Sequence, residues 1–256
     1  MTDEACIHVS RDDGICTITF DRVAKKNALN MAMYAELNTA LDEAVSDDKV
    51  RVILVRGAGG DFTSGNDLED FARFDPAGTE ESVVRFLYRL ADLNKPLVAA
   101  VEGVAVGIGT TLLLHCDLVY AADNAMFQLP FVKLGLCPEA ASSLLLPLLA
   151  GYQRAAELLL LGEPFSAQKA REIGLVNGVF AAGDVFNEAF GQARKLTALS
   201  PAAISASKGL LQRSRRSLVT ETITAELAVF RQRLASPETS AALSDFFQRT
   251  LKKKQG

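Results

Sequence analysis

Two periods of hydrophobic and polar alternation run through the first two-thirds of the chain. Strand-like period-two alternation or short apolar runs predict strands at residues 15–20, 50–55, 97–101, 118–121 and 125–127. Apolar residues at helical spacing, with capping or terminating residues beside them, predict helices at residues 31–45, 80–93, 110–115, 139–149 and 167–173. Asn30 and Ser166 are the expected N-caps of two of these helices, and Gly174 is the expected end of the last.

The pattern changes after Val179, beyond which we predict helices alone. Ser200-Pro201 and Ser236-Pro237 each resemble an N-cap followed by proline at the first helical position. We therefore predict one α/β domain, with a core at residues 1–199 and a helical region at residues 200–256. The apolar faces of the tail helices, at positions such as Leu227, Phe230 and Leu234, need cover from the core or from another subunit.

Composition excludes several classes of protein. The 256 residues are 49% hydrophobic and 23% charged, with a formal net charge of −4 and both signs spread along the chain, which argues against nucleic acid as the main partner. The four cysteines form no C-x-x-C pair and there are two histidines, so we expect neither a disulfide framework nor a metal site.

Two stretches of the sequence indicate where in the cell the protein is expected. Residues 1–6 are acidic and have no apolar core, so we expect no signal peptide. The most apolar stretch, residues 97–114, contains Glu102 and three glycines, which favours a buried strand, turn and helix over a membrane span. We expect a cytoplasmic protein without contact to a membrane.

Two glycine-containing segments follow predicted strands. Neither Gly57-Ala58-Gly59-Gly60 nor Gly107-Ile108-Gly109 continues into G-x-G-x-x-G or G-K-[ST], which argues against a nucleotide site. Residues 62–68, Phe-Thr-Ser-Gly-Asn-Asp-Leu, are consistent with a ligand loop or with an ordinary turn and helix cap. Residues 103–109 are consistent with an oxyanion-binding helix start or with close packing of a helix on a sheet.

Glu139 lies in the apolar run 134–145. Desolvation there would raise the pKa of its carboxyl group toward neutrality, which suits a general base. The structural alternative is a first-turn glutamate that offsets the dipole of the predicted helix.

Together these segments resemble the crotonase (enoyl-CoA hydratase/isomerase) superfamily over nearly the whole chain. The matching segments, in the family's order, are Asp21-Arg22 with Asn27-Ala28-Leu29, then residues 62–68, Lys95-Pro96, residues 101–107, and residues 116–121. The resemblance implies a spiral of ββα turns and a C-terminal helical region that builds trimers, often paired as hexamers. It also implies an acyl-CoA thioester substrate and no separate cofactor.

The resemblance also implies roles for individual residues. The backbone N–H groups of Asn66 and Ile108 would stabilise the thioester oxygen as it gains enolate charge. The segment Ala24-Lys25-Lys26 matches the loop that contacts the adenosine end of coenzyme A, although Val23 replaces the family's usual proline. The remaining substrate-binding positions implied by the motifs are Ser64, Gly65, Asp67, Leu68 and Gly107.

Carboxylates distinguish the subfamilies. The two positions that hold glutamates in the family's hydratases match Thr111 and Phe131, whereas residues 134–139, Leu-Gly-Leu-Cys-Pro-Glu, resemble the pattern of peroxisomal-type Δ3,Δ2-enoyl-CoA isomerases. That resemblance implies a single catalytic base, Glu139, and an isomerase of fatty-acid β-oxidation or related acyl-CoA catabolism.

Two rival functions remain open at this point. A hydratase or other crotonase-fold lyase would need a second carboxylate near Glu139, for which Asp67 and Glu69 are candidates. A non-catalytic relative that binds acyl-CoA or RNA is the other rival, and the basic cluster at Arg213, Arg215 and Arg216 is its supporting feature.

Overall fold

The computed structural model describes residues 6–72 and 81–255. The strands are β1 Ile7–Asp12, β2 Ile15–Phe20, β3 Val52–Gly57, β4 Leu97–Val101, β5 Val104–Val106, β6 Leu118–Ala122, β7 Met126–Gln128, β8 Phe165–Ser166 and β9 Gly178–Phe180. The helices are α1 Met31–Ser46, α2 Leu68–Ala72, α3 Glu81–Asp92, α4 Ile108–Thr111, α5 Ser142–Ala150, α6 Tyr152–Ala156, α7 Ala167–Glu172, α8 Val185–Thr197, α9 Pro201–Gln212, α10 Arg216–Leu234 and α11 Pro237–Gln255. Shorter helical turns are η1 Val23–Lys25, η2 Leu112–His115, η3 Val132–Leu134 and η4 Glu157–Leu161.

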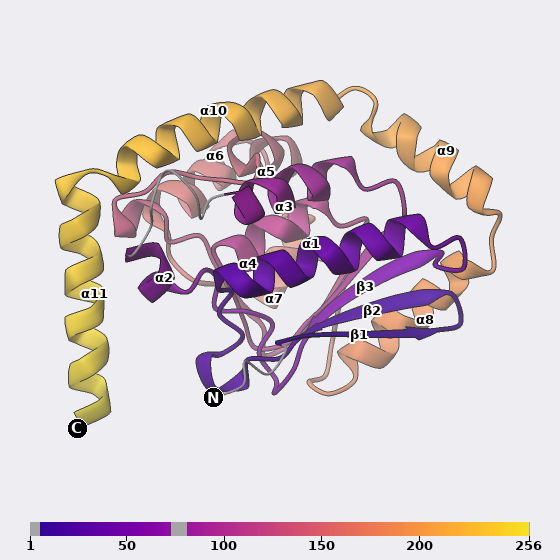
Figure 1. The fold of residues 1–256 in the computed structure, drawn as a ribbon, viewed down its shortest axis with the longest axis horizontal. Coiled ribbons are helices and arrows are strands. Elements are labelled where there is room, and N and C mark those ends of the chain that lie inside the picture. The colour runs from indigo at the N-terminus through magenta and orange to yellow at the C-terminus, as the bar shows by residue number, and fades with distance from the viewer. Residues whose placement is uncertain (1–5, 73–80, 256) are drawn as a thin grey trace.

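The main sheet has the strand order β1-β2-β3-β4-β6-β9, in which β1 pairs antiparallel to β2 and the other neighbours are parallel. Helices α1 and α3 cover one face, and α8 covers the other (Figure 1). Side chains of β3 alternate between the two layers: Ile53 packs with α1 and Leu54 with α8. Because both of their faces are buried, β3, β4 and β6 are almost continuously apolar.

The strands β5, β7 and β8 form a second sheet, which shares no strand with the first. One isolated bridge, between Thr63 and Ala105, connects β5 to the loop after β3, and a second, between Leu29 and Asn66, connects that loop to the segment after β2. These bridges bring the segments after β2, β3 and β4 together in space, although they lie far apart in the sequence.

Most predicted elements are confirmed, with shifts of up to a few residues at their ends. Asn30, Ser166, Ser200 and Ser236 cap helices through their side chains. Strand β1 was not predicted, because it is an exposed edge strand in which Ile7 is the buried residue. Glu80, the predicted first residue of the helix over 80–93, lies outside the described residues.

The predicted helix over residues 139–149 is wrong at its start. Helix α5 begins at Ser142, because Ala140 and Ala141 have left-handed backbone conformations with φ of 57° and 56°. Glu139 therefore lies in a turn before the helix and not in its first turn. The predicted helix over 110–115 is a short α-helix followed by a 3-10 turn.

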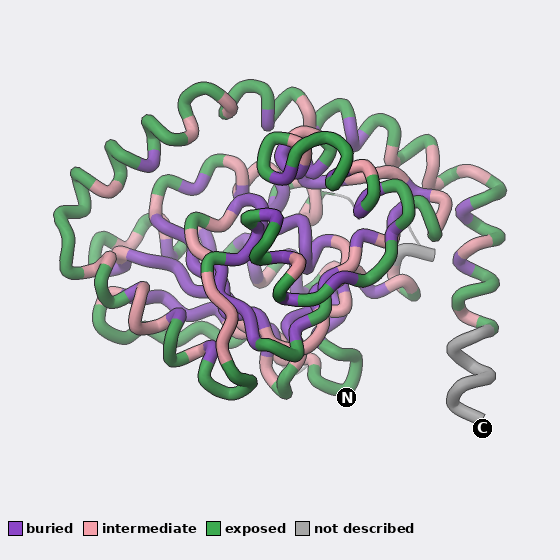
Figure 2. Tube along the Cα trace, turned by 180° about the vertical axis from the view of Figure 1, so that it is seen from behind, coloured by how far each residue is buried: buried purple, intermediate pink, exposed green. Residues whose placement is uncertain are grey.

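Helices α9, α10 and α11 arch over the core from one end to the other (Figure 1), and most of their surface is exposed (Figure 2). The Nζ atom of Lys208 on α9 donates to the Asp117 carboxylate at 2.6 Å and to the Lys95 carbonyl at 2.8 Å. Leu227 is buried, and Phe230 and Leu234 pack partly against the main core. The core thus covers much of the apolar face of α10.

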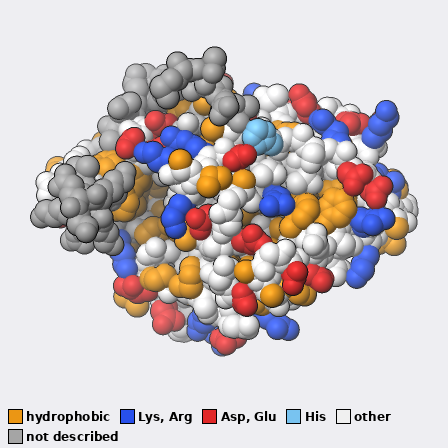
Figure 3. Space-filling model, turned by 90° about the horizontal axis from the view of Figure 1, so that it is seen from below, with side chains coloured by type: hydrophobic (Ala, Val, Ile, Leu, Met, Phe, Trp, Pro, Cys, Tyr) orange, Lys and Arg blue, Asp and Glu red, His pale blue; other side chains and the backbone are white. Residues whose placement is uncertain are grey.

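Charged side chains of both signs are interspersed on the face that Figure 3 shows. In the cluster proposed for RNA, Arg216 forms an ion pair with Asp92, so part of its charge is neutralised. Among the helices of residues 6–72 and 81–255, none is long and apolar enough to cross a membrane.

Candidate active site

Two loops meet at the edge of the second sheet. The Thr63 N–H donates to the Val104 carbonyl, and the Val106 N–H donates to the Thr63 carbonyl, both at 3.0 Å. A Cβ atom at position 65 would lie 2.6 Å from the Val106 carbonyl oxygen, so the close approach of the loops requires Gly65. The residues predicted to supply the two N–H donors, Asn66 and Ile108, come from these two loops.

The N–H groups of Asn66 and Ile108 share a property that most buried backbone donors lack. Among the described residues, neither has a hydrogen-bond acceptor, whereas the flanking N–H of Asp67 donates to the Leu29 carbonyl at 2.8 Å. Ile108 is the first residue of α4, where helical N–H groups have no acceptor in their own helix. Gly107, with φ of 57°, makes the turn that starts this helix.

Both residues line a cavity of about 440 Å³. The predicted substrate-binding residues that line it with them are Ser64, Gly65, Leu68 and Gly107. The rest of its wall is mostly apolar and comes from Val106, Gln128, Pro130, Phe131, Lys133, Leu134, Leu136, Phe230, Ala242, Asp245 and Phe246. An apolar cavity with a few convergent polar groups is typical of a site for an organic ligand.

Glu139 is 6% exposed, and its Oε1 atom accepts a hydrogen bond from the Thr111 hydroxyl at 2.5 Å. Burial raises the pKa of the Glu139 carboxyl group to about 8, the Thr111 hydrogen bond opposes that rise, and the charge of Glu226 adds to it. Thr111 follows Ile108 by three residues, so the two lie on the same side of α4. The carboxylate is therefore held against α4 through Thr111, although neither Glu139 nor Thr111 is among the residues that line the cavity.

Tyr34 of α1 was missed as a site residue. It is fully buried, and its hydroxyl donates to the Asn66 side-chain oxygen at 2.5 Å. Burial and then the charge of Glu139 raise the pKa of Tyr34 well above its ordinary value, so the phenol stays protonated and remains a donor. The signal in the sequence was a hydroxyl within an otherwise apolar helix face.

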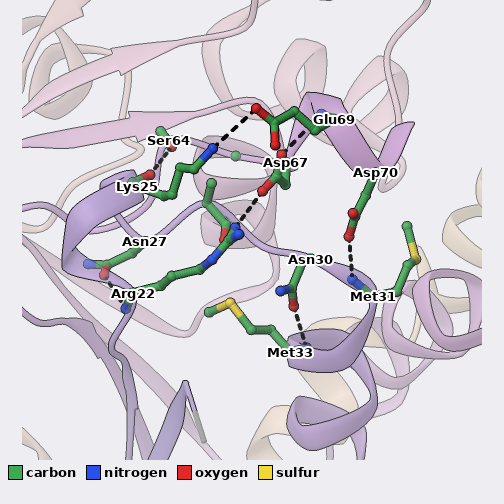
Figure 4. A network of polar contacts seen from close by, with 12 residues as sticks. Arg22, Lys25, Asn27, Asn30, Met31, Met33, Ser64, Asp67, Glu69 and Asp70 are labelled. Atoms are coloured by element: carbon green, nitrogen blue, oxygen red, sulfur yellow. Dashed lines mark hydrogen bonds and ion pairs between the residues drawn. The ribbon is translucent and has the colours of Figure 1, made fainter. Parts of the chain in front are cut away.

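A polar network ties the segment after β2 to the loop after β3 (Figure 4). Arg22 donates to the Asp67 carboxylate at 2.5 Å, and Lys25 donates to Glu69 at 3.3 Å. Although burial alone would raise the pKa of Asp67, the Arg22 hydrogen bond and charge hold it below its ordinary value. Asp67 does not line the cavity, and its observed contacts are those of a group that fixes the loop.

The predicted coenzyme A loop, Ala24-Lys25-Lys26, lies beside the cavity and is exposed. The Ser64 N–H donates to the Lys26 carbonyl at 2.9 Å, and the Ser64 hydroxyl donates to the Lys25 carbonyl at 3.1 Å. Val23 begins the η1 turn of this loop. The loop therefore adjoins a cavity-lining residue without lining the cavity itself.

Sequence reasoning also missed Glu226, a buried carboxylate of α10 near Glu139. Its Oε2 atom accepts from the Ala141 N–H at 2.6 Å, and its Oε1 atom accepts from the Ser143 N–H at 2.9 Å. Glu226 thus fills the helix-capping role that the sequence left open for Glu139. The available signal was a glutamate in the apolar stripe of α10.

Nothing in the described residues gathers three or more His, Cys, Asp or Glu side chains where they could hold a metal ion. Of the two sequence candidates for a second carboxylate, Asp67 pairs with Arg22, and Glu69 is exposed and pairs with Lys25.

Comparisons with known proteins cover nearly the whole chain. Residues 10–253 match the enoyl-CoA hydratase/isomerase family. Enoyl-CoA delta isomerase 2 of Rattus norvegicus is 37% identical over 249 residues, which is 95% of this chain and 63% of that protein, so the chain spans less than two-thirds of its length. The 2,3-dehydroadipyl-CoA hydratase of Escherichia coli is 35% identical over 94% of this chain and 95% of that protein.

The solved structure of Pseudomonas aeruginosa OdaA is similar in both fold and sequence. It superposes with a TM-score of 0.92 and is 45% identical, covering 95% of this chain and 99% of that one. The predicted crotonase fold, with its C-terminal helical region, is confirmed.

The raised pKa of Glu139 predicts a pH-dependent effect on stability. Between the ordinary pKa of 4.5 and about 8, the folded chain retains a proton that the unfolded chain loses, so stability falls as pH rises through this window. Because glutamine does not ionise, Glu139→Gln should raise Tm relative to the natural chain, and the difference should grow between about pH 5 and about pH 8.5.

Differential scanning fluorimetry measures this difference across the pH range. Glu221→Gln is the matched control, because Glu221 is exposed on α10. A Tm difference that is constant with pH would mean that Glu139 titrates as an ordinary glutamate.

Proposed function

Because the chain belongs to the enoyl-CoA hydratase/isomerase (crotonase) family, we propose that it is a Δ3,Δ2-enoyl-CoA isomerase whose sole base is Glu139. The observation that carries the proposal is the buried Glu139 carboxylate, held by the Thr111 hydroxyl next to the helix that begins at Ile108. Its pKa of about 8 leaves it able both to take and to return a proton near neutral pH.

The proposed reaction begins with transfer of a C2 proton from a 3-enoyl thioester to the Glu139 carboxylate. The electron pair of the C–H bond delocalises through the thioester, which forms a dienolate with its negative charge on the thioester oxygen. The carboxylic acid of Glu139 then protonates C4, and the double bond moves to C2–C3. One group accepts and returns the proton, so no second acid or base is needed.

The N–H groups of Asn66 and Ile108 are the proposed donors to the thioester oxygen. Both lack an acceptor within the described residues, so they are available to a ligand without breaking an existing hydrogen bond. The Tyr34 hydroxyl holds the Asn66 side chain at 2.5 Å and thereby supports the orientation of its backbone. Donors fixed before substrate arrives stabilise developing charge without a reorganisation cost.

Hydration is a more demanding reaction, because a water molecule must be placed and activated as well. Thr111 and Phe131 stand at the two positions where the family's hydratases carry glutamates. Glu226 is a second carboxylate near Glu139, but its two oxygens accept hydrogen bonds from backbone N–H groups. These contacts favour proton transfer over addition of water.

A hydratase is the second candidate, and the similarity to the Escherichia coli 2,3-dehydroadipyl-CoA hydratase supports it. For either reaction we propose an acyl-CoA substrate whose adenosine end binds near Lys25 and Lys26. Both side chains are exposed cations beside the cavity, which suits the phosphate groups of coenzyme A.

We also propose a homotrimer or a hexamer. Leu148 and Leu149 of α5 and Leu160 and Leu161 of η4 are exposed, and burying such side chains favours association. Multi-angle light scattering at micromolar concentration should give a mass of three or six chains. A monomer would contradict this proposal.

The preference between the two reactions is directly testable. With trans-3-hexenoyl-CoA and crotonyl-CoA assayed side by side, isomerisation should exceed hydration by at least about tenfold, or ~1.4 kcal/mol in the barrier. Hydration that equals or exceeds isomerisation would overturn the isomerase proposal in favour of the hydratase.

Replacing the base should remove turnover and leave binding intact. Glu139→Gln retains the size of the side chain, and we expect kcat to fall on the order of 10⁴-fold, the upper end for a positioned acid–base group. Affinity for a saturated acyl-CoA, measured by calorimetry, should change little. Full activity in this variant would place the base at another residue.

A further inference from the structure

The buried face of α10 contains a carboxylate that the proposed reaction does not use. Glu226 is 8% exposed and lies between Ile223 and Leu227, which are both buried. A carboxylate in such a stripe costs free energy unless hydrogen bonds compensate for its lost hydration. The groups that form hydrogen bonds with the Glu226 carboxylate therefore explain why this position holds a polar residue.

Those partners lie at the start of α5. The N–H groups of Ala141 and Ser143 both donate to the Glu226 carboxylate, at 2.6 and 2.9 Å. Ala141 is the N-cap residue of α5, and it has no side chain that could satisfy the helix's first N–H groups. Glu226 supplies that cap from a helix 85 residues further along the chain.

The capped segment has an unfavourable backbone conformation. Ala140 and Ala141 have φ of 57° and 56°, a region that residues with a Cβ atom disfavour. On the other side of the turn, the Nε2–H of His115 donates to the Ala140 carbonyl at 2.8 Å. Burial lowers the pKa of His115 to about 4, so the ring is neutral and this contact persists at neutral pH.

Glu139 directly precedes this turn, and its carbonyl accepts from the Ser142 N–H at 3.0 Å. Residues 140–142 therefore fix the backbone that carries its side chain. We propose that Glu226 is a positioning residue, whose two hydrogen bonds hold this turn in the conformation that directs the Glu139 carboxylate to Thr111. The inference rests on the proposed function and extends it to a residue that does not touch the substrate.

The charge of Glu226 has a second effect. Glu139 faces Thr111 of α4, Tyr34 of α1 and Glu226 of α10, and the charge of Glu226 adds to burial in raising its pKa. The Cys137 thiol contacts the Glu226 carbonyl, and the guanidinium of Arg233 lies near that thiol. Removing the charge at position 226 should thus lower the pKa of Glu139.

The test compares Glu226→Gln with the natural chain in the pH dependence of isomerase kcat/KM. Glutamine can accept one of the two N–H bonds but carries no charge. We expect kcat/KM at its optimum to fall on the order of 10- to 100-fold, as for a misplaced catalytic group. The acid limb of the profile should shift to lower pH, and binding of a saturated acyl-CoA should be retained.

Glu221→Gln, the same change at an exposed site on α10, is the control and should match the natural chain. Adding Ala141→Gly to Glu226→Gln separates the two effects, because glycine adopts positive φ without strain. The double variant should recover most of the rate but not the pH of the acid limb. If Glu226→Gln melts below the assay temperature, Glu226→Asp should lower kcat/KM while the acid limb stays in place.

A readout without turnover keeps this inference distinct from the isomerase assignment. The Tm difference caused by Glu139→Gln, followed against pH, reports the titration of Glu139 whatever reaction the chain catalyses. Its midpoint should move to lower pH when Gln replaces Glu226. The inference would be overturned if the Glu226→Gln chain had the same rate, acid limb and Tm titration as the Glu221→Gln control. If turnover is absent but the titration of Glu139 still shifts, the isomerase assignment alone would be overturned.

Discussion

The site depends on the parallel bridge between Thr63 and Ala105, because this bridge holds the loop after β3 against the start of α4. The two strands that precede these loops lie side by side in the main sheet, but the chain leaves that sheet after each strand and pairs again at the second sheet. Gly65 permits the approach, and the ion pair between Arg22 and Asp67 fixes the outer side of the loop. Asn66 and Ile108, which come from distant segments, thus line one cavity.

The second constraint is the burial of two carboxylates close to one another. Each costs free energy of hydration, and the two charges repel. Glu226 is compensated by backbone N–H groups, whereas Glu139 has the Thr111 hydroxyl as its hydrogen-bond partner. The less compensated carboxylate is the one whose pKa reaches about 8, and a raised proton affinity is the property that a base for C–H acids needs.

The sequence predicted β2, β3, β4, β6 and β7 and most helices because their signals are local: period-two alternation in β2, a continuous apolar run in β4, and capping serines and asparagine. It did not predict the edge strand β1 or the short strands β5, β8 and β9. It did not predict the turn at Ala140 and Ala141, since alanine favours helix and the left-handed conformation is stabilised by His115 and Glu226, which are distant in sequence. The pairing of Tyr34 with Asn66 was missed for the same reason. Such contacts appear only when elements pack, and the roles of Asn66, Ile108 and Glu139 came from resemblance to a family.

Glu139 lies in a turn and not within a helix or strand, which has a consequence for how this scaffold diversifies. Positions 111, 131 and 139 come from three separate segments, and none of them lies in a strand. A carboxylate can be gained or lost at any of them without a change in strand register. Substitutions there change the groups that the site presents while the strands are kept, and relatives 37% and 35% identical to this chain carry isomerase and hydratase names.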